Sequence, residues 1–236
     1  MERIILMVIK SIFNLPLWSL NIIKYTHVEK YDEPKRYLFL RNLIKVVNRR
    51  GRVIIKHYGL SNLPSDNGYI LYPNHQGLFD ALAIIDTHSK PLTTVSKQEI
   101  RNVIFIKDVF RILESKFIDR DDVRATMKVM MEITKEVKEG RNYIIFPEGT
   151  RSKDKNNIGE FKGGSFKCAM NAKAPIVPVA ILDSYKAFDT HSIKKTTVQI
   201  HYLKPLYYED YKDMKSLEIA TYVSEQIKKT ISEYDV

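Results

Sequence analysis

The chain has 236 residues, and its 38 Lys and Arg against 28 Asp and Glu give a formal net charge of +10. This length fits one domain that buries a sizeable core, since a domain near this size hides roughly 70% of the surface of its unfolded chain. With 44% hydrophobic and 28% charged residues, the composition excludes a disordered or collagen-like chain. The single cysteine, Cys168, excludes an intramolecular disulfide and a cysteine-cluster metal site, and the cell interior is the natural compartment.

The positive charge is concentrated at the start of the chain. Residues 1–60 contain 12 basic and 4 acidic residues, a net charge of +8, whereas the rest of the chain carries +2. A basic quarter attached to a nearly neutral body indicates an anionic partner, which could be nucleic acid, an acidic protein or an anionic membrane.

Residues 4–23 (IILMVIKSIFNLPLWSLNII) are mostly apolar. Lys10 interrupts the run and no small-residue cleavage site follows, which disfavours a secretory signal. Arg3, Lys10, Asn14 and Asn21 are spaced so that they share one helical face. This pattern predicts an amphipathic helix that lies in the membrane interface and is broken near Pro16 into two short helices. A membrane-spanning helix and a helix packed on the soluble core are the alternatives.

A basic stretch follows at residues 24–56. Beside an interfacial helix it predicts the second half of a two-part membrane anchor, because each basic residue near an anionic leaflet contributes about 1 kcal/mol. For Arg36, Arg41 and Lys45 a solvated helix face is the alternative. We therefore assign residues 1–50 to an N-terminal helical membrane-association segment and residues 51–236 to one catalytic-sized domain.

The pattern beyond residue 50 alternates between strands and helices. Runs rich in Ile, Val, Tyr and Thr, bounded by Gly, Pro or Asn, predict strands at 53–59, 69–72, 92–96, 116–118, 142–146, 176–181 and 197–203. Helices are predicted at 78–87, 99–113, 121–139, 164–172 and 215–234. The clearest is 121–139, where Val123, Met127, Met130, Thr134 and Val137 repeat at helical spacing. The alternation predicts an α/β fold, a single layered domain with a mixed, largely parallel sheet flanked by helices.

His75 and Asp80 follow the second predicted strand. A histidine beside a carboxylate suits general-base catalysis, because the carboxylate fixes the imidazole tautomer and the other ring nitrogen takes a proton from a hydroxyl. On one continuous helix, residues five apart would point about 140° away from each other. A strand-to-helix turn, with His75 in the loop and Asp80 in the first helical turn, would bring them together, and Gly77 permits such a turn.

A second polar cluster, residues 146–152 (FPEGTRS), follows the predicted strand at 142–146. Gly149 lets the backbone approach a ligand, while Thr150 and Arg151 offer a hydroxyl and a guanidinium, which together suit an oxyanion such as a phosphate. Glu148 is unsuited to binding that anion, so we expect it to orient Arg151 or to bind a substrate hydroxyl. Residues 117–120 (FIDR) place Arg120 at a further strand end.

These clusters, together with residues 177–181 (VPVAI), occur in the order and spacing of the four motif blocks of the glycerolipid acyltransferases. From about residue 50 to 205 the chain resembles that family, and in particular the 1-acyl-sn-glycerol-3-phosphate (lysophosphatidate) acyltransferases. The second and third blocks are far more specific than the first. The short hydrophobic N-terminus is also similar.

The resemblance implies transfer of a fatty acyl group from an acyl thioester to the sn-2 hydroxyl of lysophosphatidate, which gives phosphatidate in phospholipid biosynthesis. It implies that His75 deprotonates the acceptor hydroxyl, that Asp80 orients His75, and that no acyl-enzyme, metal or cofactor takes part. Glu148 matches a residue required for activity. The resemblance assigns substrate binding to Lys97, Arg120, Glu148, Gly149, Thr150 and Arg151.

The expected partners are an anionic membrane surface, a lysophospholipid acceptor, and an acyl donor carried on acyl carrier protein or coenzyme A. The expected location is the cytoplasmic face of the cell membrane. A family member that uses glycerol 3-phosphate or another lysophospholipid is the first alternative. A non-enzymatic module that binds anionic membranes or nucleic acid is the second. Nucleic acid is not expected, because the basic stretch lacks a recognised motif and adjoins a lipid-like segment.

Overall fold

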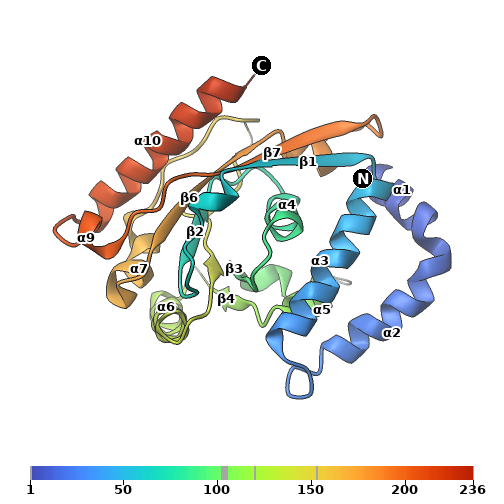
Figure 1. The fold of residues 1–236 in the computed structure, drawn as a ribbon, viewed down its shortest axis with the longest axis horizontal. Helices are drawn as coiled ribbons and strands as arrows, with labels where there is room; N and C mark the ends of the chain where they lie inside the picture. The colour runs from blue at the N-terminus through green and yellow to red at the C-terminus, as the bar shows by residue number, and fades with distance from the viewer. Residues whose placement is uncertain (1, 102–105, 120, 153, 236) are drawn as a thin grey trace.

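Helices and strands alternate along the chain as the sequence predicts (Figure 1). The computed structural model describes residues 2–101, 106–119, 121–152 and 154–235. Each predicted strand is present, with bounds shifted by at most two residues at either end. The strands are β1 (Val53–Tyr58), β2 (Ile70–Pro73), β3 (Thr93–Lys97), β4 (Lys116–Ile118), β5 (Tyr143–Ile144), β6 (Ile176–Leu182) and β7 (Thr196–Tyr202).

Over the described residues these strands form one seven-stranded sheet in the order β1-β7-β6-β2-β5-β3-β4. Neighbouring strands are parallel, except that β6 and β7 are antiparallel. The predicted α/β fold with a mixed, largely parallel sheet is therefore confirmed. Because the direction reverses between β6 and β7, strands β1 and β7 begin at the same edge of the sheet at which β2 and β6 end.

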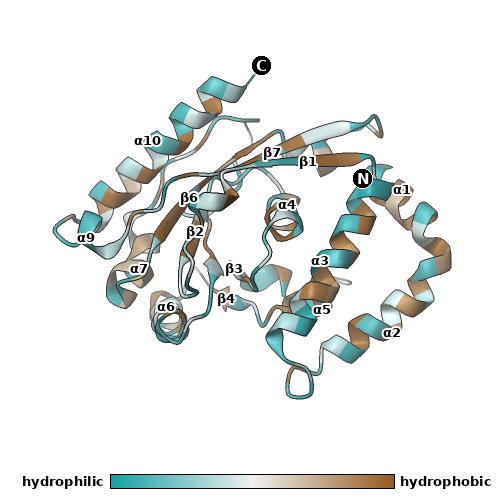
Figure 2. Ribbon diagram, in the orientation of Figure 1, coloured by the Kyte–Doolittle hydropathy of each residue, from teal (hydrophilic) through white to brown (hydrophobic). Residues whose placement is uncertain are grey.

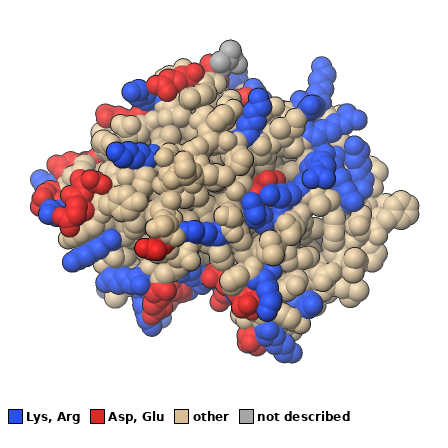
Figure 3. Space-filling view, in the orientation of Figure 1, with Lys and Arg blue, Asp and Glu red and all other residues tan. Residues whose placement is uncertain are grey.

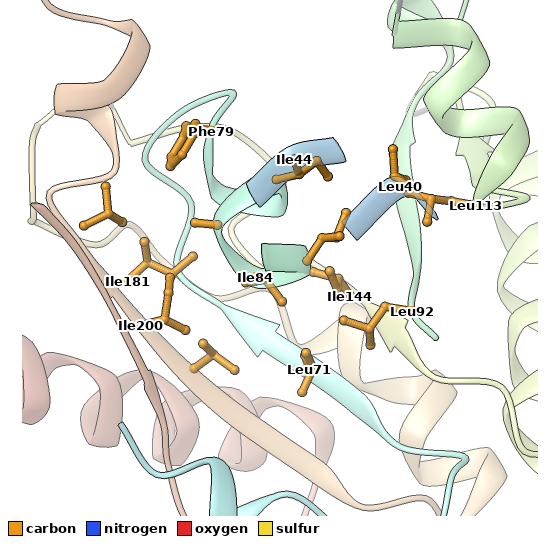
Figure 4. Packing of buried hydrophobic residues seen from close by; sticks show 14 of the residues in the cluster. Leu40, Ile44, Leu71, Phe79, Ile84, Leu92, Leu113, Ile144, Ile181 and Ile200 are labelled. Atoms are coloured by element: carbon orange, nitrogen blue, oxygen red, sulfur yellow. The ribbon is translucent and has the colours of Figure 1, made fainter. Parts of the chain in front are cut away.

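The central strands β2, β5 and β6 are buried on both faces of the sheet. Along β6 the side chains of Val177, Val179 and Ile181 enter one apolar cluster, and those of the alternate residues enter a second cluster on the opposite face. Two buried faces require the continuous apolar sequence that β6 has. Figure 4 shows the first cluster, where Leu40 and Ile44 pack over the sheet.

Helices cover both faces. The longer ones are α1 (Glu2–Ser11), α2 (Leu15–Tyr25), α3 (Glu33–Arg50), α4 (Asp80–Thr87), α5 (Ile106–Ile112), α6 (Val123–Lys138), α7 (Lys167–Ala172) and α10 (Ser216–Tyr234). Two short helices are α8 (Tyr185–Phe188) and α9 (Tyr208–Tyr211). The start of α6 is set by Asp122, whose side chain accepts a hydrogen bond from the Ala125 amide, and Gly140, with a φ of 94°, lies just past its end.

The N-terminal segment is broken near Pro16, as predicted. A 3₁₀ turn (Ile12–Asn14) separates α1 from α2, and Pro16 lies in the first turn of α2. The prediction that Arg3, Lys10, Asn14 and Asn21 form one polar face exposed to solvent is wrong in part, because Arg3 faces the protein. Arg3 is buried and donates hydrogen bonds to the carbonyl oxygens of Gly51, Ala187 and Lys194.

The predicted basic anchor at 24–56 is also corrected in part, since Arg36 is buried in the protein and Arg41 is partly buried. The Arg36 side chain is 3% exposed and hydrogen-bonds the carbonyl oxygens of Tyr31 and Ile112 and the Glu114 carboxylate. Arg41 donates to the carbonyl oxygens of Asp86 and Thr87 at the end of α4. A guanidinium carries five donors and can bind several carbonyl oxygens at once. The presence of an arginine in this sequence therefore does not predict that its side chain is exposed.

Candidate active site

The predicted functional residues gather along one edge of the sheet. His75 follows the end of β2, residues 146–152 follow β5, and Lys97 ends β3. Parallel strands in adjacent positions place their carboxyl ends together, which is where open α/β sheets bind ligands. Arg120, which follows β4 in the sequence, lies outside the described residues.

His75 and Asp80 are in direct contact. His75 lies in the loop after β2 and Asp80 is the first residue of α4, which is the strand-to-helix turn that the spacing requires. His75 Nδ1 and Asp80 Oδ2 are 2.7 Å apart. With Nδ1–H donated to the carboxylate, the lone pair of the imidazole lies on Nε2.

Asp80 is held by several further donors. Its side chain is 1% exposed. Oδ2 also accepts hydrogen bonds from the backbone amides of Gln76 (2.6 Å) and Gly77 (3.0 Å), and Oδ1 accepts one from the Ser184 hydroxyl. These donors fix the carboxylate in one position, and the carboxylate in turn fixes the imidazole.

The His75 ring remains accessible on one side. Its side chain is 21% exposed, and the ring stacks on Phe146 with the ring centroids 4.1 Å apart. The pair therefore presents a partly exposed imidazole ring that a substrate hydroxyl can approach. This geometry suits abstraction of a proton from a hydroxyl.

Glu148 joins the two site loops. Oε1 accepts a hydrogen bond from the His75 amide (2.7 Å), and Oε2 accepts one from the Gly159 amide (2.9 Å). Burial raises the pKa of this carboxyl, although the two amides act in the opposite direction. Both carboxylate oxygens of Glu148 thus accept hydrogen bonds from backbone amides. The sequence analysis expected a contact with Arg151 or with a substrate hydroxyl instead.

The phosphate-binding candidates lie in the loop after β5 and at the end of β3, and the Ser152 amide joins the first of these to the His75 carbonyl (2.7 Å). Gly149 has a φ of 69°, which places it in the left-handed region that favours glycine. Thr150 is exposed, and the half-exposed Arg151 side chain lies 3.8 Å from Asp189. Lys97 is partly buried at the end of β3.

Buried amides, which the sequence analysis did not single out, tie the His75 loop to β6. Asn74 exchanges two hydrogen bonds with the backbone of Ile181, and Gln76 accepts one from the Ser184 amide. Gln76 also donates to Asn156, which donates to Asp235 near the end of the chain. The sequence signal for these contacts is that Asn74 and Gln76 flank the candidate histidine, His75. Among the described residues, no group of three or more His, Cys, Asp or Glu could hold a metal ion.

Comparison with known families agrees with this geometry. The family model described as "Acyltransferase" matches residues 54–182, which is more than half of the chain. The chain belongs to the acyltransferase family. The matched region runs from β1 to the end of β6 and includes His75, Asp80 and residues 146–152.

Individual relatives extend the comparison. A probable 1-acyl-sn-glycerol-3-phosphate acyltransferase of Mycoplasma genitalium is 30% identical over 172 residues, which cover 68% of this chain and 59% of the relative. The 1-acyl-sn-glycerol-3-phosphate acyltransferase of Escherichia coli is 26% identical and covers 70% of this chain and 68% of its own length. The chain thus spans less than two thirds of the M. genitalium relative.

A solved structure shares the fold. The crystal structure of the 1-acyl-sn-glycerophosphate (LPA) acyltransferase PlsC from Thermotoga maritima superimposes with a TM-score of 0.79 at 23% sequence identity. The match covers 98% of this chain and 96% of the other, so it includes the N-terminal helices as well as the sheet.

Proposed function

We propose that the protein transfers a fatty acyl group from an acyl thioester to the sn-2 hydroxyl of lysophosphatidate, giving phosphatidate. The observation that carries the proposal is the 2.7 Å contact between His75 and Asp80 at the strand edge. Family membership and the names of the relatives support the reaction and the acceptor.

The reaction follows from the chemistry of that pair. His75 Nε2 removes the proton of the acceptor hydroxyl while its oxygen attacks the thioester carbonyl. The resulting tetrahedral intermediate collapses, the C–S bond breaks, and the thiolate takes the proton back from the imidazolium. Asp80 stabilises the positive imidazolium that forms between these steps.

The acceptor phosphate is assigned to Arg151 and the backbone around Gly149. A guanidinium binds a phosphate through paired hydrogen bonds. Arg151 is half-exposed, and among the described residues its one ion pair is a 3.8 Å contact with Asp189, so it is available to a ligand. Lys97 and Arg120 are proposed to add positive charge at the neighbouring strand ends. Glu148 acts on the substrate through the loops that it holds.

The protein is further proposed to act at the cytoplasmic face of the cell membrane. Among the described residues, one helical segment, Glu2–Tyr25, is long and apolar enough to cross a membrane, and only 11% of its most apolar window is buried. Figure 2 shows the apolar residues along α1 and α2. Phe13 (96% exposed), Leu20 (67%) and Leu17 (60%) lie on the uncovered side. The Arg3 contacts that hold α1 to the body favour a segment that lies in the interface over one that spans it.

One assay tests the reaction. Purified protein is offered lysophosphatidate, glycerol 3-phosphate or lysophosphatidylcholine, each with acyl carrier protein and coenzyme A thioesters, and thiol release is measured. Lysophosphatidate should be the preferred acceptor, and His75→Ala should lower turnover by about a thousandfold. Preference for another acceptor would support the alternative within the family. Full turnover in His75→Ala would overturn the mechanism.

A vesicle-binding assay tests the membrane assignment. Phe13→Ser with Leu17→Ser should weaken binding, because it removes apolar surface that would enter the lipid. Leu217→Ser on α10, where the native side chain is also 60% exposed, is the matched control. Equal loss in both variants would contradict the assignment to α1 and α2.

A further inference from the structure

A group of unpaired cations lies at the turn between α3 and β1 and at the start of β7. Arg49, Arg52 and Lys195 line a hollow of about 470 Å³ whose apolar wall is formed by Val53 and Ile54. In the part of the chain that the structure describes, none of the three cations forms an ion pair within 4.0 Å. Figure 3 shows Lys and Arg side chains gathered on this side of the molecule, next to a largely uncharged surface.

This hollow opens at the same edge of the sheet as His75. Val53 pairs with Thr196 at the start of β1 and β7, and this edge is shared with the ends of β6 and β2. Three strand spacings separate β1 from β2, which is roughly 14 Å. The hollow is therefore separate from the candidate acceptor site at Arg151, which follows β5, one strand further along, and both lie at the same edge of the sheet.

The hollow also borders α1. The Arg3 guanidinium donates to the carbonyl oxygens of Gly51 and Lys194, the residues that directly precede Arg52 and Lys195. The Met7 side chain packs so closely on Gly51 that a Cβ there would lie 2.1 Å from Met7 Cε. The opposite side of α1 exposes apolar residues, including Ile9 at 62%. The cations thus lie on the protein side of α1, and the exposed apolar residues lie on its other side. Beside an interfacial helix, the protein side is at the level of the lipid head groups.

Glu2, the acidic residue beside Arg3 in the sequence, lies 3.7 Å from His191, and among the described residues no carboxylate forms an ion pair with Arg49, Arg52 or Lys195. Burial and the nearby Arg52 both lower the pKa of Arg3, so the cations at this turn disfavour one another. A bound phosphate would relieve that repulsion and would accept hydrogen bonds from the guanidinium groups.

We propose that the hollow lined by Arg49, Arg52 and Lys195 binds the phosphate of an anionic membrane lipid and so turns the His75 edge toward the bilayer. Its membrane setting rests on the proposed function. A lipid phosphate is favoured over a soluble one because the hollow has an apolar wall and lies at the turn on which α1 packs, the helix whose other side exposes apolar residues. The nucleotide phosphates of coenzyme A are the soluble source that the experiment must separate.

The test compares full-length variants on vesicles of phosphatidylcholine with and without phosphatidylglycerol. The triple variant Arg49→Gln, Arg52→Gln, Lys195→Gln should lose binding to the phosphatidylglycerol vesicles by on the order of 100-fold, since each cation near an anionic surface contributes about 1 kcal/mol. Its binding to pure phosphatidylcholine should change little. The control removes three exposed lysines from α6 and α10, on the other side of Figure 1, with Lys128→Gln, Lys138→Gln and Lys229→Gln.

Equal loss in the triple variant and the control would overturn the proposal, because net charge alone would then explain binding. Loss of binding to coenzyme A alone, with vesicle binding intact, would overturn it in favour of a donor site. If the triple variant fails to fold by circular dichroism, the single exposed change Lys195→Glu replaces it, with Lys128→Glu as control. The vesicle assay measures binding and does not depend on turnover. Thiol release by the wild type tests the proposed reaction separately, so failure of one proposal can be told from failure of the other.

Discussion

Ser184 Oγ donates a hydrogen bond to Asp80 Oδ1, the carboxylate oxygen that His75 does not contact. Ser184 is fully buried just after β6, and its amide also donates to Gln76 in the loop that carries His75. One residue thus positions both the carboxylate and the loop that carries His75. It lies 104 residues away from Asp80 in the sequence.

We expect Ser184→Ala to lower kcat by about tenfold to a hundredfold, because a hydrogen bond to a charged group is worth about 1.5–3 kcal/mol. KM for both substrates should stay nearly constant, because Ser184 acts on the base and not on the ligand. Steady-state kinetics check this. A rise in KM with unchanged kcat would contradict a role in positioning Asp80.

Glu148→Gln should also lower turnover by about tenfold or more. A glutamine has one carbonyl oxygen, so one of the two amides that Glu148 accepts from, at His75 or Gly159, would lose its partner at a cost of about 1–3 kcal/mol. Hydrogen exchange at these two amides should become faster. Glu160→Gln changes an exposed neighbour and is the control. Unchanged exchange together with lost activity would indicate direct contact with substrate instead.

The contact between His75 and Asp80 and most of the sheet could be predicted because both depend on local sequence. Gly77 and the strand before His75 define the turn, and continuous apolar runs define strands buried on both faces. The partners of Asp80 and Glu148 could not be predicted in the same way. Ser184 and Gly159 come from separate segments that only the folded sheet brings to the site.

The burial of particular residues was harder to predict than the elements themselves. The periodicity at 121–139 predicts α6, but Val123 and Met127 are 67% and 61% exposed, and Ile133 and Val137 are the residues buried in the core. Spacing shows that residues share a helical face, but the position of the helix on the sheet decides which part of that face is covered. Arg3 is the converse case, a charged residue whose burial depends on three distant carbonyls.

Stability should fall as pH falls below neutral because of His88. This side chain is fully buried, its Nδ1 and Nε2 contact the Lys90 carbonyl and the Tyr69 hydroxyl, and burial lowers its pKa from 6.5 to about 4. Between pH 6.5 and pH 4 the unfolded chain binds a proton that the folded protein does not. The free energy of unfolding therefore decreases as the pH decreases through this range. The contribution of His88 is fully present above pH 6.5, and about 3 kcal/mol of it is lost by pH 4.

Urea unfolding of the wild type and of His88→Gln at a series of pH values measures this contribution. The variant should be less stable at neutral pH but should show a shallower dependence on pH in the acid range. Parallel curves for the two proteins would assign the acid sensitivity to other groups.

Arg3→Ala should detach α1 from the body of the protein. The substitution leaves the carbonyl oxygens of Gly51 and Ala187 without their buried donor, and we expect a cost of about 3 kcal/mol. Amides of α1 should then exchange much faster than in the wild type. Lys10→Ala, an exposed change on the same helix, should leave exchange unaltered, and a similar effect of both variants would show that α1 depends on helix propensity alone.

Asp189 tests the assignment of Arg151 to the acceptor phosphate. The two side chains are 3.8 Å apart and partly exposed, so their ion pair contributes at most about 1 kcal/mol. Asp189→Asn should free Arg151 and lower KM for lysophosphatidate by up to about fivefold. Arg151→Ala should raise that KM. With monoacylglycerol, an acceptor without phosphate, neither variant should change KM, because the guanidinium then has no anion to bind. Equal effects on both acceptors would place the phosphate elsewhere, with Lys97 as the next residue to substitute.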